Sequence, residues 1–311
     1  MFLVGVDIGG TKCKVSLGRE RQGKLEFIAH GKPHATAEHN CAAMLDVLLE
    51  DVLGFAEKAG EKPAAIGISC GGPLDQKQGL ILSPPNLPGW ARVPITDFFS
   101  KAMGIPAFLL NDADACALAE WKYGAGFDKS RGQSCANMIF LTFGTGLGAG
   151  LILDGKLYQG ANGMAGEAGH IRMTDNGPLG FGKRGSLEGW CSGGGLSGAY
   201  FDLYGEKISG GEVCIRAERG DEKALKVTEG SAFILGRFLA LIIDIINPDR
   251  IVIGSIFARS EGLFRNRIEE IIKEESLPLS AGVCSVHPAA LGESLGDAAA
   301  LCAAINGLAS A

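Results

Sequence analysis

An aspartate followed by a glycine-rich turn stands near the start of the chain. Asp7 ends an apolar, β-rich run, and the turn after it contains Gly9, Gly10, Thr11 and Lys12. A turn without Cβ atoms lets backbone N–H groups and a hydroxyl approach phosphate oxygens, and an acid beside it can hold Mg²⁺ directly or through water. The spacing is not that of a P-loop. The alternative interpretation is a plain β-hairpin with an incidental aspartate.

The middle of the chain repeats this pattern. An apolar run over residues 138–141 leads into a second glycine turn, and another apolar run follows over residues 151–153. The second turn contains Thr142, Gly144, Thr145 and Gly146. Two such turns, if they face each other, could hold the phosphates of one nucleotide from both sides. We interpret the repeat as a weak internal duplication at the scale of a domain, with coincidence as the alternative.

An asparagine and an aspartate follow the apolar run over residues 107–110. This places Asp112 at the carboxyl end of a predicted strand, which is where α/β sheets hold ligands. A general base for a sugar hydroxyl would have this position and this chemistry. Asn111 and Asp112 would serve equally well as a helix N-cap. From these residues alone, both interpretations stay open.

The stretch from Gly160 to Gly198 is rich in glycine and polar residues. We expect one long loop here, and a loop of that length inside a compact domain is usually functional. It carries Glu167, His170 and Glu188, whose carboxylates and imidazole offer acceptors for the O–H groups of a polyol. Salt bridges at the surface are the alternative role for these side chains.

The remaining apolar patterns predict alternating helices and strands. Residues 41–58 have helical spacing, and residues 64–69 form a short apolar run typical of a buried strand. The segment 233–246 predicts a core helix that ends before Pro248, and residues 296–305 predict an Ala-rich helix that returns to pack on the first lobe. Alternation of this kind indicates α/β architecture.

The length of the chain predicts more than one domain. At 311 residues it exceeds one ordinary hydrophobic core, so we expect two lobes with a cleft between them. We expect the N-terminal α/β lobe to cover residues 1–115, joined by a C-terminal helix over residues 297–311. The C-terminal α/β lobe is expected to cover residues 116–296.

Composition and charge argue against several classes of protein. The formal net charge is -6 without a block of Lys or Arg, which argues against nucleic-acid binding. The nine cysteines are scattered singly and favour reduced thiols in a cytoplasmic protein. Residues 1–6 lack the features of a signal peptide. The apolar segment 233–246 is interrupted by Arg237 and Asp244, so we expect no membrane span.

Taken together, these motifs resemble the ROK family of sugar kinases and sugar-responsive repressors over nearly the whole chain. The two glycine turns look like the family's two phosphate motifs, and Asn111 with Asp112 looks like the pair whose aspartate is the catalytic base. Four further residues resemble the family's sugar-contacting positions, namely Asn86, Glu167, His170 and Glu188. Residues 247–254, which end at Gly254, resemble the strand beside the adenosine end of the nucleotide.

The resemblance implies two ribonuclease-H-like lobes of the actin and hexokinase type, which close over ATP and a hexose at a central cleft. Asp112 would be the catalytic base. The implied sugar-binding residues are Asn86, Asn111, Glu167, His170 and Glu188. The implied nucleotide-binding residues are Asp7, Gly9, Gly10, Thr11, Lys12, Thr142, Gly144, Thr145, Gly146 and Gly254, with Mg²⁺ held near Asp7 through water. We also expect a homo-oligomer, with a dimer favoured.

Two departures from the family pattern stand out. Family members often bind zinc through three cysteines and the histidine that corresponds to His170, but the matching stretch here, residues 179–188, has no cysteine. We therefore expect no zinc site, and we expect Leu179 and Phe181 to hold the loop by apolar packing, with Gly182 and Gly185 keeping its turns. The second departure is Ser255, where family members commonly have another glycine after Gly254.

Two rival functions remain in view. The first is a sugar-sensing regulator without catalysis, although Asp7 stands almost at the N-terminus and leaves no room before it for a DNA-binding domain. The second is a kinase for an N-acylated hexosamine such as N-acetylmannosamine, in place of glucose. The residues named above do not separate these sugars, because they would contact hydroxyls that many hexoses share.

Overall fold

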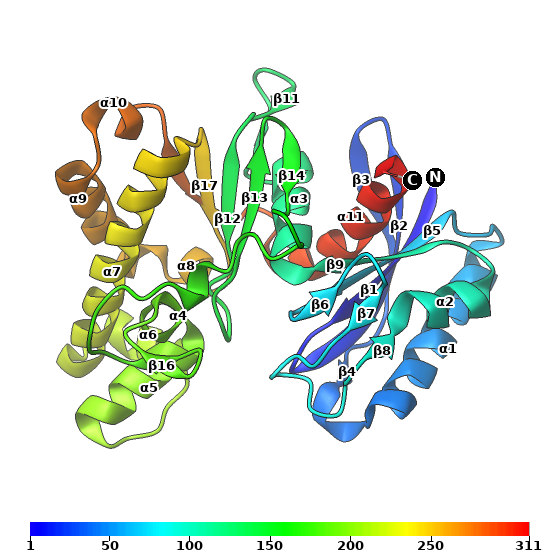
Figure 1. Cartoon of the computed structure of the whole chain (residues 1–311), viewed down its shortest axis with the longest axis horizontal. Helices are drawn as coiled ribbons and strands as arrows, with labels where there is room; N and C mark the ends of the chain where they lie inside the picture. The colour runs from blue at the N-terminus through cyan, green and yellow to red at the C-terminus, as the bar shows by residue number, and fades with distance from the viewer. Residues whose placement is uncertain (311) are drawn as a thin grey trace. The chain divides into compact units, whose positions relative to one another are not determined.

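The computed structural model describes residues 1–310 and shows two compact units, drawn in Figure 1. Unit 1 comprises Met1–Ala119 together with the residues from Glu293 onward, and unit 2 comprises Glu120–Gly292. The chain passes between the units within α3 (Asp112–Tyr123) and again within η4 (Gly292–Ser294). These boundaries, after residues 119 and 292, differ by four residues each from the expected boundaries after residues 115 and 296.

Unit 1 is built on one main sheet. Its strand order is β3 (Lys24–His30), β2 (Lys12–Arg21), β1 (Phe2–Ile8), β5 (Ala65–Cys70) and β9 (Ala107–Asn111), and β4 (His34–Ala35) also pairs with β2. β1 runs antiparallel to β2 and parallel to β5, which runs parallel to β9. The carboxyl ends of β1, β5 and β9 therefore meet at one edge, where Asp7 is opposite Ser69 and Asn111 is opposite Cys70.

Three helices surround this sheet, and α11 packs closest to it. They are α1 (Cys41–Ala59), α2 (Ile95–Met103) and α11 (Leu295–Ser310), with a short turn of helix, η1 (Thr36–Glu38), before α1. The Ala-rich α11 contacts β1 and β5. A Cβ atom on Gly67 of β5 would lie 2.0 Å from the carbonyl oxygen of Ala300. The close approach therefore depends on glycine in the strand and small residues in the helix. A smaller sheet joins β6 (Leu74–Asp75), β7 (Leu80–Ile81) and β8 (Val93–Pro94).

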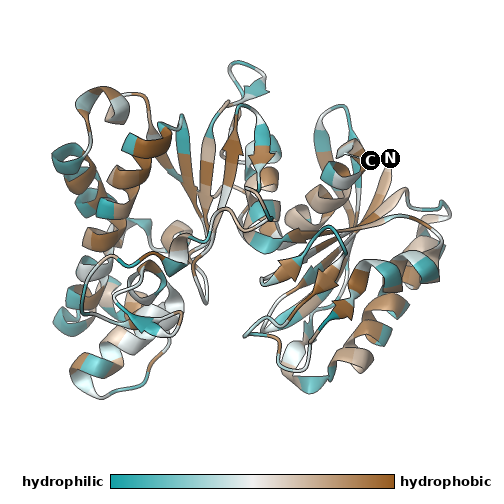
Figure 2. Ribbon diagram, in the orientation of Figure 1, coloured by the Kyte–Doolittle hydropathy of each residue, from teal (hydrophilic) through white to brown (hydrophobic). Residues whose placement is uncertain are grey.

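The main sheet of unit 2 repeats the arrangement of unit 1. Its order is β14 (Lys156–Tyr158), β13 (Ala149–Leu153), β12 (Met138–Leu141), β17 (Arg250–Ile253) and β18 (Ser285–Pro288). β12 runs antiparallel to β13 and parallel to β17, and β17 runs parallel to β18. In both sheets a glycine turn joins the first antiparallel pair, and Figure 2 shows the central strands mainly apolar. The repeat seen in the two glycine turns thus extends to the order and direction of the strands in the two main sheets.

Helices make up much of the rest of unit 2. They are α4 (Leu187–Trp190), α5 (Gly193–Tyr204), α6 (Gly210–Glu218), α7 (Glu222–Ile246), α8 (Ile256–Arg259), η3 (Glu261–Leu263), α9 (Arg265–Glu275) and α10 (Pro278–Ala281). The expected core helix is the second half of α7, which begins earlier because the Asp221 side chain accepts a hydrogen bond from Ala224 N–H. It ends at Asn247, which is left-handed with φ 50°. Among the described residues, no helix combines the length and apolar character needed to cross a membrane.

The stretch from Gly160 to Gly198 is not the single loop that we expected. It contains η2 (Ala168–His170), a hairpin of β15 (Leu179–Gly180) and β16 (Lys183–Arg184), then α4 and the start of α5. Ser186 accepts a hydrogen bond from Gly189 N–H and Ser192 accepts one from Gly195 N–H, so both helices begin at a capping serine. Glycine has a low helix propensity, so the glycines within α4 and at the start of α5 favoured a loop in the sequence prediction. A further hairpin joins β10 (Phe127–Asp128) and β11 (Gln133–Ser134).

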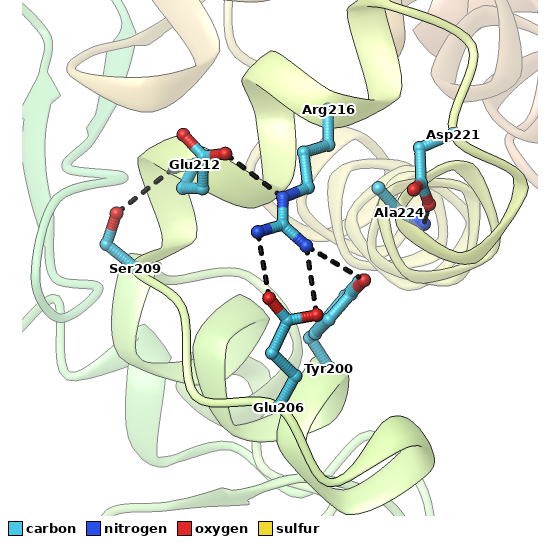
Figure 3. Close-up of polar contacts among 7 residues, drawn as sticks. All are labelled: Tyr200, Glu206, Ser209, Glu212, Arg216, Asp221 and Ala224. Carbon is cyan, nitrogen blue, oxygen red and sulfur yellow. Dashed lines mark hydrogen bonds and ion pairs between the residues drawn. The ribbon is translucent and has the colours of Figure 1, made fainter.

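An arginine network fixes the connection between α5 and α6 (Figure 3). Arg216 of α6 donates two hydrogen bonds to the Glu206 carboxylate, at 3.0 and 2.9 Å, and one to Glu212 at 3.0 Å. Its guanidinium also lies 3.4 Å from the hydroxyl of the buried Tyr200. The hydrogen bonds from Arg216 lower the pKa of the Glu206 carboxyl. Ser209 caps α6 beside this network by accepting a hydrogen bond from Glu212 N–H. The segment between α5 and α6 is therefore held at Glu206 and at Ser209.

Candidate active site

The first glycine turn lies at the end of β1, with its backbone fixed from within unit 1. Gly9 N–H donates to the carbonyl oxygen of Lys12 at 3.0 Å, and the Thr36 hydroxyl donates to the carbonyl oxygen of Gly9 at 2.7 Å. Gly10, Thr11 and Lys12 remain exposed. The turn therefore presents exposed backbone and a hydroxyl on a rigid support, which suits an anionic ligand.

Asp7 lies near the end of β1, just before this turn, and is surrounded closely by other groups, among them the carboxylates of Asp112 and Asp297. A Cβ atom on Gly296, in the first turn of α11, would lie 2.7 Å from Asp7 Oδ2. Burial, followed by repulsion from Asp112 and Asp297, raises the pKa of Asp7 from 3.8 to about 7, while Lys12 and Lys14 act in the opposite direction. A divalent cation near this carboxylate would offset the repulsion, so the residues present fit Mg²⁺.

Asn111 and Asp112 both contact the first turn of α3. Asn111 Oδ1 accepts hydrogen bonds from Ala113 N–H at 2.9 Å and from Asp114 N–H at 3.4 Å, which is capping geometry for α3. Asp112 Oδ1 also accepts from Ala113 N–H, at 2.8 Å. The Asp112 side chain is accessible to solvent, yet desolvation by the surrounding protein raises the pKa of its carboxyl. Its second oxygen, Oδ2, lies near the turn at Gly71.

Asn86 lies next to the first glycine turn. It is exposed, in a turn anchored by the buried side chains of Leu87 and Trp90. A Cβ atom on Gly10 would lie 2.7 Å from Asn86 Cβ and 2.9 Å from the Asn86 carbonyl oxygen. The predicted phosphate turn and the predicted sugar-binding turn are therefore in direct backbone contact.

The second glycine turn, in unit 2, is closed by its own threonine. Thr142 Oγ1 accepts a hydrogen bond from Gly148 N–H at 2.8 Å, so this hydroxyl is engaged in shaping the turn. Gly193 N–H donates to the carbonyl oxygen of Gly144 at 2.7 Å, which ties the turn to the start of α5. Thr145 is exposed. In the same unit, Gly254 at the end of β17 donates its N–H to Leu141 at 2.9 Å, beside the strand that leads into the turn.

Glu188 joins the predicted sugar-binding residues of unit 2 to the second turn. Its Oε2 accepts a hydrogen bond from Leu147 N–H at 3.0 Å and would lie 2.6 Å from a Cβ atom on Gly146. Gly169 of η2 packs against the Cβ atom of Glu188. The exposed side chains of Glu167 and His170 flank this glycine in the chain. Unit 2 thus gathers Glu188 and the η2 segment around the turn.

Known proteins resemble this chain along nearly its whole length. The sequence matches the ROK family over residues 3–305. The chain belongs to the ROK family. Its sequence is 30% identical to a glucokinase of Thermotoga maritima over 309 residues, covering 94% of each chain. It is 28% identical to an N-acetylmannosamine kinase of Citrobacter koseri over 295 residues, covering 92% of this chain and 94% of the relative.

Solved ROK structures share the fold along the whole chain. A ROK hexokinase from Thermus thermophilus superposes with a TM-score of 0.85 and 28% identity, covering all of both chains. A ROK glucokinase from Streptomyces griseus, in complex with glucose and AMPPNP, superposes with a TM-score of 0.78 and 27% identity, covering 98% of this chain and all of that one. These neighbours confirm the actin and hexokinase type of α/β fold.

The hairpin of β15 and β16 lies within residues 179–188, the stretch in which we expected no zinc site. Lys183 Nζ lies 3.3 Å from His170 Nδ1, and the Phe181 ring meets the His170 ring edge-on at 5.5 Å. Gly182 and Gly185 have φ of 69° and 71°, so they keep the turns as expected. Leu179 is 60% exposed and Phe181 is 46% exposed, so the expected apolar packing is wrong for Leu179, and the ring contact of Phe181 is with His170. No group of three metal-binding side chains occurs within residues 1–310.

The sequence interpretation missed one charged cluster of this ROK protein. Asp297 of α11 is only 4% exposed, and its Oδ2 contacts Lys14 Nζ at 2.7 Å and His30 Nδ1 at 2.6 Å. The cluster lies close enough to Asp7 for Lys14 and Asp297 to influence its pKa. The available signal was an acid inside an otherwise apolar, Ala-rich helix.

Proposed function

We propose that this ROK protein transfers the γ-phosphoryl group of ATP to a hydroxyl of a hexose, with glucose as the first candidate. The observation that carries the proposal is the state of Asp112. Its carboxylate stands at the carboxyl end of β9 with a raised pKa and access to solvent, while the neighbouring Asn111 provides the helix cap. A carboxylate in that condition is suited to accept a proton from a hydroxyl.

The reaction needs a base, phosphate-binding groups and sugar-binding groups acting on the same substrates. The sugar oxygen attacks the γ-phosphorus, the bond from phosphorus to the ADP oxygen breaks, and the hydroxyl proton passes to Asp112 Oδ2. The exposed backbone of the two glycine turns, with Thr11, Lys12 and Thr145, would hold the phosphates. Asp7 would hold Mg²⁺ through water. The ion supplies charge stabilisation to the transferring phosphate.

Sugar recognition would come from side chains in each unit. In unit 1, Asn86 is exposed, and the Nδ2 group of Asn111 is not used in the helix cap. In unit 2, Glu167 and His170 are exposed, and Glu188 keeps its Oε1 atom while Oε2 binds Leu147. A contact from Lys183 to His170 Nδ1 favours the tautomer with its proton on Nε2, which would then donate to a sugar oxygen.

An assay of ADP release over a panel of hexoses, with ATP and Mg²⁺, tests the proposal. We expect turnover with glucose. Turnover confined to N-acetylmannosamine would instead favour an N-acylhexosamine kinase, a candidate that the 28% identity to an N-acetylmannosamine kinase supports. Sugar binding without turnover of any hexose would contradict the proposal and support a sugar-sensing regulator. The preference for a dimer stays a prediction, to be measured by sedimentation.

A further inference from the structure

Ser255 has a backbone conformation that side chains rarely adopt. It follows Gly254 at the end of β17 and has φ 54° and ψ -115°. The left-handed region open to ordinary residues has positive ψ, as at Asn247, where φ is 50° and ψ is 58°. The combination at Ser255 is one that glycine adopts freely and a residue with a Cβ atom adopts at a cost.

The surrounding backbone holds Ser255 in this conformation. On one side, Gly254 N–H donates to the Leu141 carbonyl oxygen at 2.9 Å, and on the other, Ile256 N–H donates to the Phe143 carbonyl oxygen at 3.0 Å. Both acceptors belong to the segment that leads from β12 into the second glycine turn. The strained residue is therefore clamped to that turn, and the direction of its side chain is set by the clamp.

The hydroxyl of Ser255 points at the second turn without a partner there. Its Oγ atom would lie 3.6 Å from a Cβ atom on Gly144, which is ordinary van der Waals distance. Within residues 1–310 this hydroxyl makes no hydrogen bond, and the residue is only partly buried. A glycine would fit the backbone better, so the hydroxyl itself is the feature that serine adds at this position.

We propose that Ser255 Oγ donates a hydrogen bond to a phosphate oxygen of the nucleotide held at the second glycine turn. The inference rests on the proposed function, because it assumes that Gly144 and its neighbours bind the nucleotide. Phosphate oxygens only accept hydrogen bonds, and a hydroxyl beside them is a suitable donor. Hydrogen bonds to an ionised acceptor are stronger than neutral ones, so backbone strain at Ser255 is retained in exchange for nucleotide affinity.

The variants Ser255→Ala and Ser255→Gly separate the hydroxyl from the strain. Both remove the hydroxyl, but only glycine relieves the backbone. We expect both variants to weaken binding of a non-hydrolysable ATP analogue roughly tenfold, the scale of one hydrogen bond to a charged group. The KM for the sugar at saturating ATP should stay unchanged. In thermal unfolding without ligand, Ser255→Gly should gain about 2–4 °C and Ser255→Ala should not.

Several results would overturn the inference. Nucleotide affinity equal to wild type in both variants would show that the hydroxyl makes no contact. A loss in Ser255→Gly alone would assign the effect to the backbone. Equal losses for nucleotide and sugar would show a general disturbance of the unit. Wild-type protein is measured first: if it binds the analogue and turns over, only the role of Ser255 is at stake, and if it does neither, the proposed function falls together with the inference.

Discussion

Replacing Asp7 by asparagine should stabilise the protein in the absence of ligands, although it should abolish turnover. Burial and repulsion from two other carboxylates raise the pKa of Asp7 from 3.8 to about 7. Such a shift corresponds to roughly 4 kcal/mol of unfavourable free energy in the ionised form. Because Asp7 keeps some contact with solvent, we expect about half of that, ~2 kcal/mol.

The pH dependence gives the prediction its sign. A carboxyl with a raised pKa binds its proton more tightly in the folded than in the unfolded state, so folding loses stability as pH rises from 3.8 to about 7. Below pH 3.8 the Asp7 carboxyl is protonated in both states and does not lower the free energy of unfolding, whereas above about pH 7 it lowers that free energy by the full amount. Asp7→Asn should therefore gain about 1 kcal/mol at pH 5 and about 2 kcal/mol at pH 8, or roughly 2–4 °C and 4–8 °C in Tm.

Thermal unfolding at both pH values, with a chelator present and no nucleotide, measures this difference. Asp46→Asn is the matched control, because it makes the same substitution on the exposed surface of α1 and should leave Tm nearly unchanged at both pH values. A loss of stability in Asp7→Asn, or a gain that does not depend on pH, would refute the electrostatic reasoning. Turnover near the wild-type level would refute the role of Asp7 in holding Mg²⁺.

Three further predictions concern the proposed reaction. Asp112→Asn should lower kcat about 10²–10⁴-fold with sugar binding retained in calorimetry, and a wild-type kcat would leave Asp112 no role as base. Gly144→Ala should raise the KM for ATP more than the KM for sugar. Gly10→Ala should raise both KM values, because its new methyl group would collide with Asn86. The same pair of KM changes in both variants would contradict this contrast. Elemental analysis should find no stoichiometric zinc, and a zinc chelator followed by Mg²⁺ should leave activity intact, while inactivation reversed by zinc would show that the loop at His170 binds the metal after all.

The parts of the fold that could be predicted were those written locally in the sequence. The glycine turns after residues 8 and 141 each join neighbouring antiparallel strands, so apolar runs and glycines a few residues apart were enough to find them. The helix α1 was found for a similar reason, because its apolar residues recur at helical spacing within one short stretch.

The parts that could not be predicted depend on contacts between distant residues. Lys14 and Asp297 are 283 residues apart, and no pattern in the sequence joins them. The bond from Leu147 to Glu188 spans 41 residues and changes the role of Glu188, because one of its oxygens is already engaged. The exposure of Leu179 was missed because an apolar residue in a hairpin was assumed to find a partner. The sequence shows which chemical groups the side chains carry, but it does not show which of those groups are already hydrogen-bonded or exposed in the folded protein.

The two units place their glycine turns in a comparable relation to the predicted sugar-binding residues. In unit 1, Gly10 lies against Asn86, and in unit 2, Leu147 N–H donates to Glu188, so each turn contacts a predicted sugar-binding residue of its own unit. Ordering one partner of such a pair lowers the entropic cost of ordering the other. Bound sugar should therefore favour nucleotide binding through each unit separately. By linkage, bound nucleotide should favour sugar binding by the same factor. Selective loss of that mutual effect in Gly10→Ala or Glu188→Gln, with the other unit intact, would show through which unit the coupling runs.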